Sequence, residues 1–169
     1  MTKAFISFHP SDREHAARFA EQFSDVVTTT LGGVNNHDEF IKNTNEAIYI
    51  QREIREKYLT NTTLTIMLAG KCTWSQRFVD WEIAASLRQD AVRGRSALLG
   101  IGLPYLGSGP TIVPERFQDN LEIGYAVFKP YPTSSEELRE WIIEALEHRD
   151  TVTPKNSRPL VLKDEKCKG

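Results

Sequence analysis

The stretch LTIMLAGKCTWSQRFVDWEIAASL, residues 64–87, decides the fold of this 169-residue chain. Its first part, residues 64–70, is a short apolar run that ends at a glycine, which is typical of a buried parallel strand. After a polar connection, Val79, Ile83 and Leu87 recur four residues apart and predict a helix that packs one stripe against a sheet. Ligands of open α/β sheets bind at the carboxyl ends of the strands, so we expect a site between this strand and this helix.

Glu82 is the charged residue of interest in this helix. It lies at the edge of the apolar stripe, one turn after Phe78, whereas Trp81 points almost opposite to the stripe. By pattern alone Glu82 is most simply a solvated helix glutamate, because charged side chains on helices usually face water. Phe78 and Trp81 could equally well be buried by a neighbouring loop or contact a ligand.

Strands and helices alternate along most of the chain. Apolar runs predict five strands, at residues 4–8, 26–31, 64–70, 97–103 and 125–128. Besides the Glu82 helix, helical spacing is found at residues 11–23, 46–59 and 134–146. Residues 105–124 contain several Gly and Pro residues and are predicted to be irregular.

This order of elements predicts an α/β fold, specifically a flavodoxin-like three-layer sandwich. Its five-stranded parallel sheet would carry helices on both faces, joined by right-handed crossovers. Residues 1–149 would form this single domain. Residues 150–169 are polar and interrupted by prolines, so we expect them to be a flexible C-terminal tail.

Composition argues against several functional classes. The net charge of −2 at pH 7 gives no basic face for nucleic acid. No apolar stretch approaches the about 20 residues of a membrane span, and no signal peptide is evident, so we expect a cytoplasmic protein. Cys72 and Cys167 are far apart in different contexts and predict neither a disulfide framework nor a zinc site. His15, His37 and His148 are too scattered to bind a metal.

Four segments occur in an order that identifies a family. They are residues 5–9 (FISFH), 50–54 (IQREI), 63–70 (TLTIMLAG) and 77–83 (RFVDWEI). Together they resemble the TIR-like domains of bacterial Thoeris anti-phage systems. Two later pieces, PERFQDN at residues 114–120 and ELREWI at residues 137–142, are similar as well, so the likeness covers roughly residues 3–149.

The resemblance implies an enzyme that takes NAD⁺ as its substrate and needs no separate cofactor. Members of this family cleave the nicotinamide–ribose bond of NAD⁺, and many release a cyclic signal derived from ADP-ribose. That signal activates a separate effector protein when phage infect. Sites in TIR proteins are often completed by a neighbouring subunit, so a homo-oligomer is expected, and residues 32–45 are our candidate for the completing segment.

Glu82 matches the catalytic glutamate of the family. Enzymatic TIR domains often carry Trp four residues before this glutamate, whereas this chain has Phe78 there and Trp81 next to the glutamate. Backbone N–H groups near the end of the first strand could hold a phosphate. The predicted substrate-binding residues lie either at that strand end or beside Glu82: Ser7, Phe8, His9, Arg77, Phe78 and Trp81.

A carboxylate suits the implied chemistry. Nicotinamide is already cationic in NAD⁺ and leaves without an acid, so the barrier lies in the positive charge that grows on the ribose. A fixed carboxylate stabilises that charge where it develops.

A non-catalytic TIR adaptor is the main alternative, because Phe78 departs from the enzymatic pattern. A nucleoside transferase would share the ribosyl-transfer chemistry and is a minor alternative. A receiver domain is excluded, because residues 5–9 lack the acidic pair that Mg²⁺ would need.

Overall fold

The computed structural model describes residues 1–32, 47–89, 94–107 and 109–167, and its centre is a five-stranded sheet. All neighbouring strands are parallel, in the order β2-β1-β3-β4-β5. This confirms the predicted flavodoxin-like α/β fold. The strands are β1 (Thr2–Ser7), β2 (Val27–Leu31), β3 (Leu64–Ala69), β4 (Ala97–Gly102) and β5 (Val127–Lys129).

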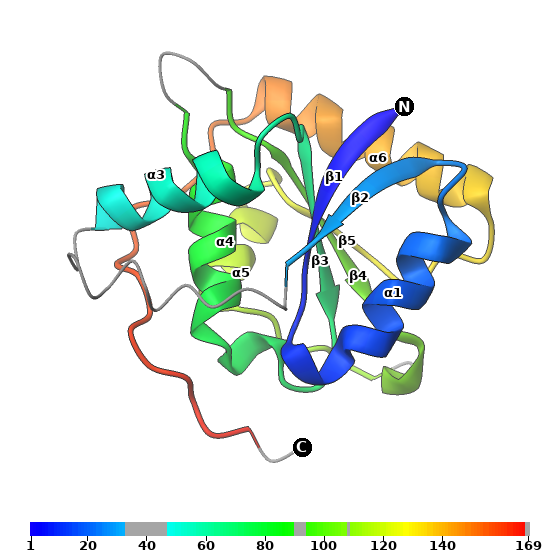
Figure 1. Ribbon diagram of the computed structural model, residues 1–169, viewed down its shortest axis with the longest axis horizontal. Coiled ribbons are helices and arrows are strands. Elements are labelled where there is room, and N and C mark those ends of the chain that lie inside the picture. The colour runs from blue at the N-terminus through cyan, green and yellow to red at the C-terminus, as the bar shows by residue number, and fades with distance from the viewer. Residues whose placement is uncertain (33–46, 90–93, 108, 168–169) are drawn as a thin grey trace.

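Helices cover both faces of the sheet. They are α1 (Arg13–Gln22), α3 (Ala47–Tyr58), α4 (Arg77–Leu87), α5 (Glu115–Glu122) and α6 (Ser135–Thr151). In Figure 1, α1 and α6 lie on one side of the strands, and α3, α4 and α5 lie on the other. In the described ranges, three short 3₁₀ helices follow strand ends or precede helices: η1 (Pro10–Asp12), η2 (Thr73–Ser75) and η3 (Pro104–Leu106).

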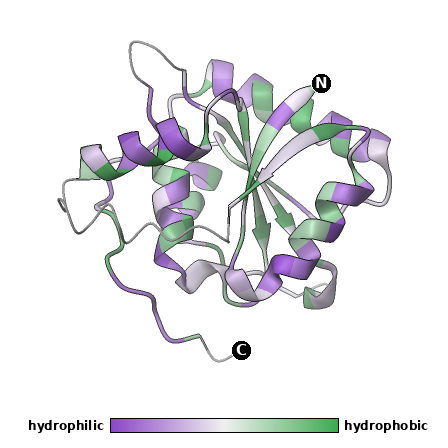
Figure 2. Cartoon of the chain, in the orientation of Figure 1, coloured by the Kyte–Doolittle hydropathy of each residue, from purple (hydrophilic) through white to green (hydrophobic). Residues whose placement is uncertain are grey.

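Alternation along the strands divides the core into two halves. Ala4 and Ile6 of β1 pack against α1 and α6, whereas Phe5 packs against α3 and α4. All six residues of β3 are buried, as expected for a central parallel strand with helices on both faces. Figure 2 shows the result: the strands are mainly hydrophobic, and polar residues occupy the outer sides of the helices.

Helix α5 was not predicted. Residues 115–122 were expected to be irregular, but they form a helix that begins directly after Pro114. Phe117 is fully buried and Leu121 packs beside it, so the helix has one narrow apolar stripe. A stripe of two residues is too short to separate from chance in the sequence, and burial against the sheet stabilises the helix.

Residues 153–167 form a segment that we call the C-terminal strap. Helix α6 continues to Thr151, two residues beyond the predicted domain boundary, and the strap then runs beside α4 (Figure 1). Asn156 donates to the Ala84 carbonyl oxygen, and the Glu165 N–H donates to the Ser75 carbonyl oxygen. These contacts differ from the flexible tail that the polar composition predicts, because the polar groups of the strap pair with polar groups of the domain.

The strap is also tied covalently. Cys72 and Cys167 form a disulfide with a Cα–Cα distance of 5.6 Å, which corrects the prediction that these residues do not pair. They are 95 residues apart in the sequence, so only the path of the strap brings them together. Within the described part of the chain, every helix is too short or too polar to cross a membrane.

We expect Cys167→Ser to lower the free energy of unfolding by about 2–4 kcal/mol, because the disulfide restricts the unfolded chain over a long loop. Urea denaturation of the oxidised protein measures this loss. The reduced parent should match Cys167→Ser, and adding Cys72→Ser should cost little more. Equal stability of the oxidised and reduced parent would contradict a stabilising disulfide.

Candidate active site

Glu82 lies on α4 between two apolar faces of that helix. Val79 and Ile83 pack toward β3 and α5, whereas Trp81 and Ala84 pack toward α3. The helix is therefore buried on two sides. Glu82 lies between these two sides and points toward the carboxyl end of β1. This location agrees with the expected place of a ligand site in a parallel sheet.

The Glu82 carboxylate is held by Ser7, the last residue of β1. The Ser7 hydroxyl donates to Glu82 Oε1 at 2.7 Å, and the two residues are 0% and 2% exposed. Strand β1 lies between β2 and β3, at the point where the strand order of this fold reverses. A buried carboxylate is thus oriented by a hydroxyl group at the topological switch point of the sheet.

Gly32, directly after β2, closes the other side of this carboxylate. A Cβ at this position would lie 3.2 Å from Glu82 Oε2 and 2.8 Å from the Ile6 carbonyl oxygen. The Gly32 N–H donates to that same carbonyl oxygen at 2.7 Å. Any larger residue would have to push Glu82 or β1 aside, so glycine is required for this close approach. Apart from Gly32, the predicted completing segment 32–45 lies outside the described residues.

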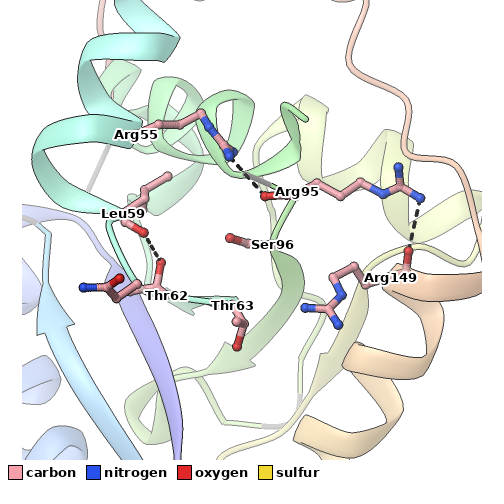
Figure 3. Close-up of a pocket in the computed structure, with 9 residues that line it drawn as sticks. Arg55, Leu59, Thr62, Thr63, Arg95, Ser96 and Arg149 are labelled. Atoms are coloured by element: carbon pink, nitrogen blue, oxygen red, sulfur yellow. Dashed lines mark hydrogen bonds between the residues drawn. The ribbon is translucent and has the colours of Figure 1, made fainter. Parts of the chain in front are cut away.

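Glu82 is covered rather than open to solvent. Glu82 is 2% exposed, and it does not line any of four well-formed cavities among the described residues. One of them lies at the opposite, amino-terminal end of β3 and β4 (Figure 3). A ligand can therefore reach Glu82 only when the atoms that cover it move.

The first-strand residues predicted to bind substrate take separate places. Ser7 contacts Glu82, as described. Phe8 is 1% exposed and packs in the core on the α1 and α6 side, because successive strand residues point to opposite faces. His9 accepts the Ser11 N–H at 3.0 Å through Nδ1 and so caps η1. The structure brings Ser7 to the carboxylate and places Phe8 on the other side of the sheet.

The predicted residues of α4 contact the strap. Trp81 is fully buried, and its Nε1 donates to the Val161 carbonyl oxygen at 2.6 Å. Arg77 forms an ion pair with Asp164 at 2.8 Å, and Asp164 also accepts the Arg77 N–H at the start of α4. Phe78 packs against the Trp81 ring at a centroid distance of 5.2 Å. The strap therefore occupies the position that we predicted for substrate at Trp81 and Arg77.

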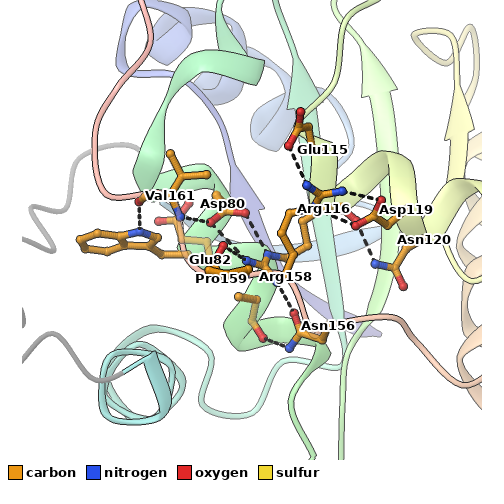
Figure 4. Close-up of polar contacts among 12 residues, drawn as sticks. Asp80, Glu82, Glu115, Arg116, Asp119, Asn120, Asn156, Arg158, Pro159 and Val161 are labelled. Carbon is orange, nitrogen blue, oxygen red and sulfur yellow. Dashed lines mark hydrogen bonds and ion pairs between the residues drawn. The ribbon is translucent and has the colours of Figure 1, made fainter.

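A buried ion pair that sequence reasoning missed lies beneath the strap (Figure 4). Arg116 on α5 is fully buried, and its Nε donates to Asp80 Oδ1 at 2.9 Å. Its two terminal nitrogens donate to Asn156 Oδ1 and to the Pro159 carbonyl oxygen. Asp80 has no ion pair with its neighbour Arg77 among the described residues. It pairs with Arg116, which no local spacing in the sequence links to it.

The edge of this cluster includes a second pair of charges. Arg158 of the strap donates to both carboxylate oxygens of Asp119 at 2.9 Å. The hydrogen bond from Arg158 lowers the pKa of the Asp119 carboxyl below its ordinary value. The pair lies nearer to solvent than Arg116, so it contributes less to stability.

Asp12 and Tyr105 form another polar contact at the carboxyl edge that the sequence did not indicate. The Tyr105 hydroxyl donates to Asp12 Oδ1 at 2.9 Å and accepts the Lys71 N–H at 2.8 Å. Burial raises the pKa of the Tyr105 phenol above its ordinary value, and Asp12 adds to this effect. Asp12 is 4% exposed, and its Oδ2 has no hydrogen-bond partner among the described residues. The contact joins the ends of β1, β3 and β4.

Among the described residues, no group of three or more His, Cys, Asp and Glu side chains is placed so that it could bind a metal ion. The arrangement at Glu82 can instead act electrostatically, because its carboxylate is fixed before any ligand arrives.

Comparison with known proteins adds one match. The family model described as "Thoeris protein ThsB, TIR-like domain" matches residues 5–108. The matched part runs from β1 to just beyond β4 and includes both Ser7 and Glu82. A search of curated proteins found no match to the chain.

Proposed function

We propose, because this chain belongs to the Thoeris ThsB TIR-like domain family, that it is an anti-phage defence enzyme that cleaves the nicotinamide–ribose bond of NAD⁺. Family membership supports a role in Thoeris defence. The family resemblance implies NAD⁺ as the substrate, and the contact between Ser7 and Glu82 supports cleavage at its ribose.

The observation that carries the proposal is the contact between Glu82 and Ser7. Breaking the bond between ribose C1′ and the nicotinamide nitrogen sends the bonding electron pair to nicotinamide, which leaves as a neutral molecule. Positive charge then grows at C1′ and on the ring oxygen. A carboxylate that Ser7 already orients at 2.7 Å needs little reorganisation to stabilise this charge.

Two products follow from the same cation. Attack by water at C1′ with loss of a proton gives ADP-ribose, whereas attack by one of the molecule's own nucleophilic groups closes a ring. Exclusion of water favours ring closure, and the burial of Glu82 supports that product. We propose that the cyclic product is the signal that activates a separate effector protein, and that a homo-oligomer is the active form.

The test is mass spectrometry of the small molecules that form when the purified full chain is incubated with NAD⁺. Protein from phage-challenged cells is tested in parallel, since infection is the expected trigger. We expect release of nicotinamide together with a product that is one water lighter than ADP-ribose. Absence of nicotinamide in both preparations would remove the enzyme assignment.

A protein-interaction adaptor is the second candidate, and the burial of Glu82 and Trp81 favours it. An adaptor would release no nicotinamide in any state. Exposed apolar side chains such as Ile112 and Leu162 would then carry partner contacts, and charged substitutions there would abolish binding. Nicotinamide release at a catalytic rate excludes a purely adaptor role.

A further inference from the structure

A cavity of about 400 Å³ opens at the amino-terminal ends of β3 and β4, opposite the Glu82 edge of the sheet. Three arginines from three different elements or their ends line it, together with short polar residues (Figure 3). The arginines are Arg55, Arg95 and Arg149, and Asn61, Thr62 and Thr63 form one rim. Its volume falls within the range of small-molecule sites, about 300–1,000 Å³.

Two of the arginines donate hydrogen bonds to backbone carbonyl groups at helix ends. Arg55 is buried and donates to the carbonyl oxygens of Ala85 and Arg88 at the end of α4. Arg95 donates to the carbonyl oxygens of Arg149 and Val152 at the end of α6. Carbonyl groups at a helix end lack helical partners and carry partial negative charge, so guanidinium groups stabilise them.

Arg149, the third arginine, contacts a carboxylate and no helix-end carbonyl group among the described residues. Its Nε pairs with Asp150 Oδ1 at 3.0 Å, and among the described residues its two terminal nitrogens make no hydrogen bond or ion pair. Figure 3 shows its side chain reaching from α6 into the cavity toward Thr63. Arg95 Nε is also buried without a hydrogen-bond partner in the described part of the chain. Within the described residues, the Arg149 guanidinium therefore presents donors to the cavity that have no acceptor.

The charge of the cavity is positive. Asp150 is the only carboxylate that the described residues contribute to this cavity and the hollow that adjoins it, and its side chain is 66% exposed. The carboxyl-terminal ends of α3, α4 and α6 add partial negative charges of about one half each. The three guanidinium groups exceed these opposing charges by about half a unit.

Local backbone geometry at the rim is unusual as well. Asn61 adopts a φ of 68°, and it is the only described residue other than glycine with positive φ. Asn tolerates this left-handed conformation better than most residues, but it still carries a cost, and such positions often lie where a binding surface must be shaped. The Asn61 amide is therefore held at the edge of the cavity next to Thr62 and Thr63.

We propose that this cavity binds a small phosphorylated molecule, whose phosphate accepts hydrogen bonds from Arg149 and whose polar body contacts the Asn61–Thr63 rim. The forked guanidinium group matches the geometry of a phosphate and can bind it through two parallel hydrogen bonds. The described lining contains no aromatic ring, so it suits a sugar-sized polar body better than a flat base. The site is independent of the Glu82 edge.

Isothermal titration calorimetry of the full chain at fixed ionic strength tests the proposal, with inorganic phosphate and ribose 5-phosphate as ligands and ribose as the uncharged comparison. We expect saturable binding of both phosphates and none of ribose. Arg149→Gln should weaken binding by about tenfold or more, because a charge-assisted hydrogen bond is lost. Arg139→Gln removes the same charge from the exposed part of α6 and should leave affinity unchanged.

We expect Asp150→Asn to raise the affinity for phosphate, which is the opposite of the effect of Arg149→Gln. Asp150 competes with the ligand for Arg149, so its neutralisation should tighten phosphate binding. Glu82→Gln should bind phosphate as the parent does, which separates this site from NAD⁺ turnover. Circular dichroism melting confirms that each variant is folded. Absence of saturable phosphate binding, or equal weakening by Arg139→Gln and Arg149→Gln, would overturn the proposal.

Discussion

We expect turnover of NAD⁺ to fall by about 10²- to 10³-fold in the Glu82→Gln variant, the size of loss seen when one preorganised electrostatic group is removed. Glutamine has nearly the same shape as glutamate and can still accept the Ser7 hydrogen bond. The substitution therefore removes the negative charge and little else. A loss of this size would lie in the transition state, because the lost carboxylate charge stabilises the positive charge that grows on the ribose.

Nicotinamide release at saturating NAD⁺ measures this effect. Glu140→Gln is the matched control, because Glu140 is an exposed glutamate on α6, which packs on the face of the sheet opposite α4. Ser7→Ala should have a smaller effect, since the carboxylate keeps its charge but loses one orienting contact. Parental turnover by a well-folded Glu82→Gln protein would show that Glu82 is not the catalytic group.

The second large effect concerns stability. We expect Arg116→Met to lower the free energy of unfolding by about 3–5 kcal/mol, because it leaves one charge of a buried ion pair without its partner. Asp80 would keep only the Val161 N–H among its described partners, while Asn156 Oδ1 and the Pro159 carbonyl oxygen would lose their donor. Methionine fills most of the space of the arginine stem, so the loss is chiefly electrostatic.

Urea denaturation measures the loss. Fluorescence of a background with Trp74→Phe and Trp141→Phe reports whether the strap stays in place, because the indole N–H of the remaining Trp81 bonds to Val161. Arg139→Met is the control: Arg139 pairs with Asp25 near the surface at 3.3 Å, and such pairs contribute about 1 kcal/mol or less. Adding Asp80→Leu to Arg116→Met should recover part of the stability, since no buried charge then remains unpaired. A loss no greater than that of Arg139→Met would contradict this account.

These two expectations are linked through the strap. Asp80 and Glu82 lie two residues apart on α4, so they point in different directions from the helix. Asp80 points toward Arg116 and the strap, whereas Glu82 points toward Ser7 and the sheet edge. The strap thus fixes the outer side of the same helix that carries the candidate catalytic carboxylate.

The sequence determined the architecture. The apolar run of residues 64–70 predicted a central strand, and β3 is buried along its whole length. Five alternating strands predicted the parallel sheet, which the strand order confirms. The sequence predicts these features because burial determines the spacing of apolar residues. A strand buried on both faces is a continuous apolar run, and a helix buried on one side has apolar residues three or four positions apart. The same periodicity placed Glu82 on a helix, and the structure sets its carboxylate at the carboxyl end of β1, the strand next to β3.

Only the tertiary structure decided the partners. Ser7 meets Glu82 across 75 residues of sequence, and Cys72 meets Cys167 across 95. Arg116 meets Asp80, and the strap covers Trp81, because crossovers and the return of the chain after α6 bring distant segments together. Hydrogen bonds and ion pairs depend on atoms within about 3–4 Å and leave no period in the sequence. The fold therefore follows from local pattern, whereas the setting of the candidate active site follows from the path of the chain.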